Sequence, residues 1–193
     1  MNWVIFTVLA AFFQNLRTSL QKRLNKNLSL VASAYVRFAF ALPFALIVFF
    51  LNFRSLDIVP IILDQNNFIY YTFLGAIFQV IFTLLLLYLF KFSNFVVGTS
   101  LSKTEVIQIA IFEYILLKDK LNLFGVIGII VATIGVIVIT IKDIKLFFRN
   151  FFSKVTLIGL TTGLILGLSV VYFRAAALSL ENFSSNFDKA ITT

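Results

Sequence analysis

The sequence predicts an all-α integral membrane protein, a polytopic bundle of about six transmembrane helices. Of its 193 residues, 61% are hydrophobic and only 12% are charged, and the mean hydropathy is +1.03. Apolar runs recur along the chain, and each is long enough to cross a hydrocarbon core of about 30 Å as a helix of about 20 residues. Water is therefore not the main solvent of this chain.

The first two predicted spans are separated by a short basic link. The first runs from about Trp3 to Ser19, and the link after it contains Lys22 and Arg23. We expect a retained helix rather than a signal peptide, because no basic n-region precedes this span. The second span covers about Leu30 to Leu51 and contains Pro43. Proline has no N–H, so one backbone carbonyl in the helix loses its donor, and a neighbouring helix or water can bond to it instead.

The next three spans are joined by links of only a few residues. The third runs from about Phe68 to Phe90, the fourth from about Phe95 to Leu117, and the fifth from about Leu123 to Ile141. Short links favour antiparallel neighbours. We therefore expect the third span to pack beside the fourth, and the fourth beside the fifth.

The remainder begins with a basic amphipathic connector, residues 142–154, which we expect in the headgroup region. The sixth span runs from about Val155 to Phe173. The stretch from Glu181 to Thr193 is polar and shows no sign of a folded tail, so we expect the chain to be a fragment.

Small residues at three- or four-residue spacing in the fifth and sixth spans predict close helix–helix packing. A sliding surface or an oligomer interface is the alternative. The glycines concerned are Gly125, Gly128, Gly135, Gly159, Gly163 and Gly167.

Composition excludes several classes of function. Cysteine and histidine are both absent, which excludes disulfides, thiol nucleophiles and histidine acid–base chemistry. The sequence shows no metal motif, phosphate-binding loop or converging carboxylates, so we expect no catalytic residues, metal or cofactor. The net charge of +8 comes largely from links between apolar runs, as in cytoplasmic loops, so we expect no nucleic-acid partner.

Charged side chains near the bilayer centre cost at least about 2.5–3.5 kcal/mol and are therefore functional candidates. The midpoint of the fourth span falls near Val106, which places Lys103 and Glu105 at mid-depth. These two side chains point in different directions, so each needs a partner from another helix. Arg37 in the second span is a candidate partner for Glu105. We favour a polar cavity around this pair.

Depth and helix spacing give the remaining candidates for substrate binding or ion coupling. The first span has one polar stripe, at positions 14, 17, 18 and 21. Interhelical hydrogen bonds for this stripe, snorkelling for Arg37 and a structural role for Glu113 are the alternatives. The candidate set is Gln14, Arg17, Arg37, Lys103, Glu105, Gln108 and Glu113.

Three segments of the second half of the chain form a recognisable pattern. They are Ser100-Leu101-Ser102-Lys103-Thr104-Glu105, the link at 116–122, and the glycines from Gly125 through Gly135. Together they resemble the end of an EamA domain of the drug/metabolite transporter superfamily. Two positions depart from the usual pattern. Lys118 stands where the family has glycine before its acid, and Val106 stands where many members have proline.

The resemblance implies two five-helix repeats of opposite orientation. Residues 1–141 would form the first repeat, and residues 155–193 would begin an incomplete second one. It also implies a permease of the cell (cytoplasmic or inner) membrane, with the lipid bilayer and a small-molecule substrate as partners. A second copy or missing C-terminal helices would complete the bundle. The family's cytoplasmic N-terminus disagrees with the loop charges, which place the N-terminus outside.

The predicted function is transport of a small polar metabolite by alternating access, without enzyme activity. One alternative is a non-transporting membrane assembly subunit, for which the glycine stripes would be the main feature. A membrane-embedded enzyme acting on lipid precursors is a weaker alternative, because its catalytic constellation is missing. Substrate identity, direction and energy coupling stay open.

Overall fold

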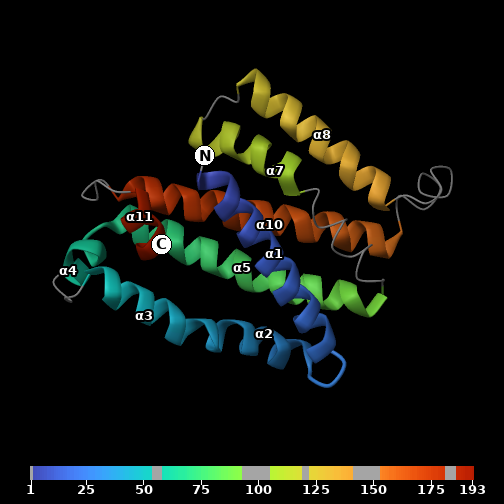
Figure 1. Cartoon of the computed structure of the whole chain (residues 1–193), viewed down its shortest axis with the longest axis horizontal. Coiled ribbons are helices and arrows are strands. Elements are labelled where there is room, and N and C mark those ends of the chain that lie inside the picture. The colour runs from blue at the N-terminus through green and yellow to red at the C-terminus, as the bar shows by residue number, and fades with distance from the viewer. Residues whose placement is uncertain (1, 54–57, 93–104, 119–121, 141–152, 181–185) are drawn as a thin grey trace.

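The computed structural model describes residues 2–53, 58–92, 105–118, 122–140, 153–180 and 186–193, and every regular element in these ranges is helical (Figure 1). The long helices are α1 (Asn2–Leu24), α5 (Asn66–Phe92), α8 (Leu123–Thr140) and α10 (Lys154–Ser179). The shorter elements are α2 (Leu30–Ala39), α3 (Ala41–Phe53), α4 (Ile58–Leu63), α7 (Glu105–Phe112), the π-helical turn η1 (Glu113–Leu117) and α11 (Asn186–Thr192).

Three helical segments in the described ranges are long and apolar enough to cross a membrane. They are Leu30–Phe53, Asn66–Lys91 and Lys154–Ser179, which correspond to the second, third and sixth predicted spans. A shorter apolar helix covers Leu123–Gly135 in the fifth. α1 has 23 residues, but its polar stripe lowers its hydropathy. The all-helical membrane bundle predicted from the sequence is confirmed.

The second span is divided near Pro43, as its proline predicts. α2 ends at Ala39 and α3 begins at Ala41, with Phe40 between them. Proline has no N–H to donate to the carbonyl four residues earlier, and its ring crowds that carbonyl. The break in the helix therefore lies one turn before the proline.

α10 is the central helix of the bundle and lies between α5 and α7 (Figure 1). A Cβ added to Gly167 would lie 3.5 Å from Ile109 Cγ1 and 3.6 Å from Gln108 Cβ. The glycine thus lets α7 approach α10 closely. α8 packs on the other side of α7, which confirms that the fourth and fifth spans are neighbours. The expected direct packing of the third span on the fourth is wrong for the described residues, because α10 takes that place.

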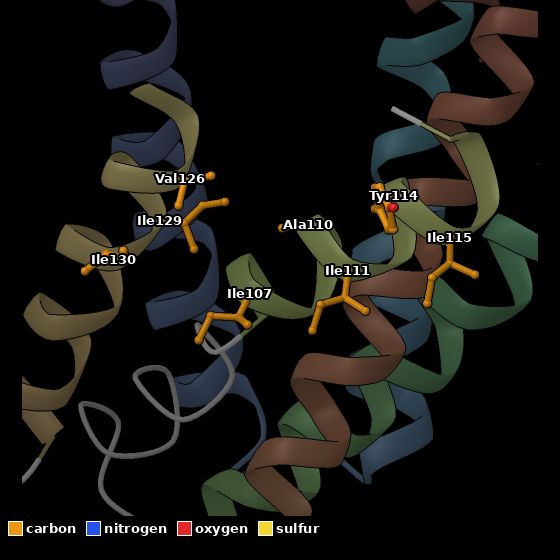
Figure 2. A pocket seen from close by; sticks show the side chains of 8 residues that line it. All are labelled: Ile107, Ala110, Ile111, Tyr114, Ile115, Val126, Ile129 and Ile130. Carbon is orange, nitrogen blue, oxygen red and sulfur yellow. The ribbon is translucent and has the colours of Figure 1, made fainter. Parts of the chain in front are cut away.

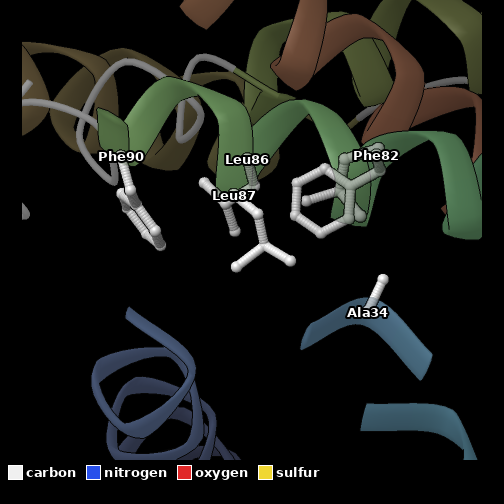
Figure 3. Packing of buried hydrophobic residues seen from close by; sticks show 6 residues of the cluster. Ala34, Phe82, Leu86, Leu87 and Phe90 are labelled. Carbon is white, nitrogen blue, oxygen red and sulfur yellow. The ribbon is translucent and has the colours of Figure 1, made fainter. Parts of the chain in front are cut away.

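Two apolar clusters pack α5 against its neighbours in the described fold. In the first, Ala34 of α2 points toward α5, whose Phe82, Leu86, Leu87 and Phe90 belong to the same cluster (Figure 3). The second contains side chains of α4, α5 and α10, namely Ile62, Phe68, Ala176 and Leu180. None of the side chains of α3 is buried, as expected of a helix that faces lipid.

The polar end of the chain is not an unfolded tail in its described part. Residues Asn186–Thr192 form α11, which packs on α3. Asn52 Nδ2 donates a hydrogen bond to Asp188 Oδ1 at 3.0 Å. The expectation of an unstructured tail is therefore wrong here, because a partner far away in the sequence stabilises this helix.

Candidate functional site

The predicted site residues lie on several helices. Gln14 and Arg17 lie on α1, Arg37 lies on α2, and Glu113 begins η1. Glu105 and Gln108 lie on α7, where Glu105 is buried. Lys103 lies outside the described residues, as does most of the predicted connector at 142–154.

Arg37 is held by α5 rather than by Glu105. Its Nη1 donates a hydrogen bond to Thr83 Oγ1 at 2.9 Å, and its guanidinium lies 5.8 Å from the ring centroid of Phe82. Thr83 Oγ1 in turn donates to the backbone oxygen of Gln79 at 2.8 Å. The expected pairing of Arg37 with Glu105 does not form, because the α2 face that carries Arg37 packs on α5.

The polar line continues from α5 to α10 through Ser169. The Ser169 hydroxyl lies 2.9 Å from Gln79 Oε1 and 2.9 Å from the backbone oxygen of Gly75. Gly75 lets α5 and α10 lie this close together, since a Cβ added to it would lie 3.0 Å from Phe173 Cδ1 of α10. Arg37, Thr83, Gln79 and Ser169 thus form a polar network across α2, α5 and α10. No local sequence pattern could identify Ser169 as the partner of Gln79.

Two further polar groups are buried where α1 and α2 meet the bundle. The Gln21 side chain on α1 is 5% exposed, and Ser33 on α2 is 0% exposed. Within the described ranges, Gln21 Nε2 and Ser33 Oγ have no hydrogen-bond partner. Both groups can donate hydrogen bonds.

The α7–η1 segment contacts α10 through two polar side chains. Gln108 Nε2 donates to the backbone oxygen of Leu160 at 3.4 Å. Glu113 accepts a hydrogen bond from Arg174 in an ion pair. η1 is a π-helical turn, a widened turn that often occurs at functional sites. Its C-cap is Lys118, whose φ of 55° lies in the left-handed region.

The predicted packing glycines have different surroundings. Gly159, Gly163 and Gly167 are buried on α10. On α8, Gly125 is partly exposed, and a Cβ added to Gly128 or Gly135 would meet nothing within 4 Å. The two glycine stripes therefore face different environments in the described structure.

An apolar pocket of about 440 Å³ lies between α7, η1 and α8 (Figure 2). The Tyr114 hydroxyl is the polar group on the side chains that line it. The pocket therefore suits hydrocarbon better than a polar solute. Its lining residues are Ile107, Ala110, Ile111, Tyr114, Ile115, Val126, Ile129 and Ile130.

No group of three or more acidic side chains in the described ranges is placed to hold a metal ion. The polar groups on α1, α2, α5, α7 and α10 include arginines, amides, hydroxyls and the Glu105 carboxylate. These groups recognise solutes by charge and hydrogen bonding.

Comparison with known proteins identifies the fold family. The family model described as the EamA-like transporter family matches residues 1–141. Neither the curated proteins nor the solved structures gave a match. The family match covers α1 to α8, which include Arg37, Gln79 and Glu113, and it covers more than half of the chain. This chain belongs to the EamA-like transporter family, whose members are membrane transporters.

Proposed function

We propose that this chain moves small polar metabolites across the cytoplasmic (inner) membrane by alternating access. Family membership supports a transporter of the drug/metabolite type. The observation that carries the proposal is the polar network of Arg37, Thr83, Gln79 and Ser169 inside a bundle of apolar helices. Polar groups at such depth are costly unless they have partners or line a polar pathway.

The same network joins the family-matched segment to the helix that follows it. Residues 1–141 act as the first repeat in this proposal, and α10 begins the second. Alternating access requires contacts between the repeats that can break and form again. Ser169–Gln79 and Arg174–Glu113 are two such polar contacts across this boundary. They support a movement of α10 relative to α5 and α7.

Glu105 and Glu113 are the proposed coupling residues, and Gln14, Arg17, Arg37, Lys103 and Gln108 are the proposed substrate contacts. Glu105 is buried on α7, the helix that packs on α10. A carboxylate at this place can couple proton uptake to helix movement. The Arg174–Glu113 pair would then respond to the position of α10.

The test is transport by the purified chain in proteoliposomes. We expect counterflow of at least one solute from a panel of labelled amino acids, sugars, carboxylates and amines, above protein-free liposomes. Folded protein that moves no panel member, but pairs stably with another membrane protein, would favour the assembly-subunit alternative.

The coupling role of Glu105 needs a separate variant. Glu105→Gln should flatten the dependence of transport on pH while the protein stays folded. Asp188→Asn removes a carboxylate from α11, far along the chain from α7, and is the matched control. An unchanged pH profile in Glu105→Gln would remove Glu105 from coupling.

A further inference from the structure

α1 and α2 form a helical hairpin whose short link brings four polar side chains to matched levels. The link covers residues 25–29. Because helix rise per residue is constant, residues equally distant from the link are level along the hairpin. Gln21 of α1 is therefore level with Ser33 of α2, and Arg17 is level with Arg37.

The hairpin is anchored to α5, so its register is held by contacts outside the hairpin. Asn25 Nδ2 donates to the backbone oxygen of Leu87 at 2.9 Å. Lys22 Nζ lies 5.4 Å from the ring centroid of Phe90. On the α2 side, Ser29 accepts a hydrogen bond from Ala32 N at 3.2 Å and caps the helix.

The pair nearer the link, Gln21 and Ser33, consists of buried groups that need a hydrogen-bond partner. Gln21 and Ser33 are 5% and 0% exposed, and their Nε2 and Oγ atoms are unpartnered within the described residues. Leaving a donor buried without a partner costs free energy. An acceptor bound at this level would satisfy both groups.

The second pair, Arg17 and Arg37, supplies positive charge about one helical turn further from the link. Arg17 lies four residues before Gln21, and Arg37 lies four residues after Ser33. This spacing places the two side chains of each helix on the same helix face. Two guanidinium groups at the same level of one hairpin repel each other when no anion lies between them. Neither forms an ion pair with a carboxylate among the described residues.

All four groups can donate hydrogen bonds, and two of them are permanently positive. The Thr83 hydroxyl takes one donor of Arg37 and orients the guanidinium. The other donors of this guanidinium can bind a carboxylate or phosphate in bidentate fashion. Arg17 is exposed in the described structure, so its guanidinium is not covered by another described helix.

We propose that Arg17, Gln21, Ser33 and Arg37 together bind an oxyanion, the carboxylate or phosphate of a small solute or of a lipid headgroup. If the oxyanion belongs to a transported solute, this inference rests on the proposed function and gives its substrate class. The anion would neutralise the repulsion of the two arginines and supply acceptors to the two buried donors.

The first experiment measures binding to the full chain in phosphatidylcholine nanodiscs, with radiolabelled inorganic phosphate and radiolabelled succinate as probes. We expect saturable binding of at least one probe and a loss of affinity of about tenfold or more in Arg37→Gln. Arg23→Gln removes an exposed charge from the same hairpin and is the matched control. Its affinity should stay within about twofold, because rim charges contribute little.

A second arm separates a solute from a lipid headgroup. Nanodiscs are prepared with phosphatidylglycerol, and the lipid that co-purifies is measured by mass spectrometry. Enrichment around the wild type but not around Arg37→Gln, without binding of soluble probes, would identify the oxyanion as a headgroup. The proposal is overturned if neither source binds, or if Arg23→Gln weakens binding as much as Arg37→Gln.

Gln21→Leu separates a binding role from a structural one. Replacing an unpartnered buried donor by an apolar side chain of similar size should leave the melting temperature unchanged or raise it. The same change should weaken anion binding by about fivefold or more. A lowered melting temperature with unchanged binding would show that Gln21 is structural and would overturn its place in the site.

Failure of this site and failure of the transport proposal give different results. Transport of neutral or cationic solutes without anion binding would leave the transporter intact and overturn the oxyanion site. Anion binding that depends on Arg37, without transport of any solute, would keep the site and overturn the transport function.

Discussion

Arg174 of α10 and Glu113 of η1 form an ion pair that joins the helix beyond the family match to the fourth predicted span. The Arg174 side chain is 45% exposed and the Glu113 side chain is 14% exposed. The pair therefore lies at the edge of the bundle. It holds α10 against the α7–η1 segment, with an exposed guanidinium and a largely covered carboxylate.

Breaking this ion pair should cost little stability. Because Arg174 is exposed, we expect a coupling energy of about 0.2–1 kcal/mol between Glu113→Gln and Arg174→Gln. A double-mutant cycle of unfolding in detergent measures this energy, and it should fall as salt rises. A coupling above about 2 kcal/mol that ignores salt would contradict this and indicate a desolvated pair.

Lys118→Gly should stabilise the protein. The φ of 55° at Lys118 places its Cβ in the left-handed region, which glycine adopts without strain. We expect a gain of about 1 kcal/mol in the free energy of unfolding. Lys118→Ala is the control, because it removes the same charge but keeps Cβ, and it should give no gain. Equal gains in both variants would mean that the lysine charge, rather than its backbone, is unfavourable.

Gly75→Ala should destabilise the contact between α5 and α10. The added Cβ would lie 3.0 to 3.2 Å from three ring atoms of Phe173, so the ring or the helix must shift. Overpacking of this kind costs about 1–3 kcal/mol. Thermal unfolding measures the loss, and Phe173→Leu in the same chain should recover part of it.

Gly128→Ala is the matched glycine control on α8. A Cβ there meets nothing within 4 Å, and alanine favours helix over glycine by about 1 kcal/mol. We therefore expect unchanged or higher stability. A loss as large as that of Gly75→Ala would show that another chain or segment covers this face of α8.

Ser169→Ala should weaken the polar connection between α5 and α10. Gln79 Oε1 and the Gly75 carbonyl would both lose the hydroxyl that contacts them at 2.9 Å. A buried polar group left without its partner costs about 1–3 kcal/mol. Thr161→Ala is the control, because its exposed hydroxyl bonds only within its own helix, to Leu157 O at 2.8 Å. Similar losses in both variants would remove Ser169 from any special role.

Local features of the fold follow directly from the sequence. Hydropathy alone predicts a membrane solvent, and the apolar runs predict helices close to α5, α8 and α10. The break before Pro43 follows from proline chemistry. The family pattern has glycine where this chain has Lys118. The preference for glycine has a local explanation, because the backbone at Lys118 has a positive φ.

The partners of the polar residues could not be derived in the same way. Arg37 was expected to face Glu105, yet it bonds to Thr83. Glu113 is among the predicted site residues, but its partner Arg174 lies on α10. Ser169, the partner of Gln79, also lies on α10, and the sequence does not predict this helix between α5 and α7.

The reason lies in the range of each interaction. Hydropathy, capping and proline effects act within a turn or two of one helix, so they can be read in sequence order. Helix neighbours in a membrane are chosen by shape and by a few polar contacts, because lipid is as apolar as the side chains it replaces. The glycines of α8 and α10 have similar spacing, yet Gly128 is open and Gly167 contacts α7. Only the packing of helices distant in sequence distinguishes the two.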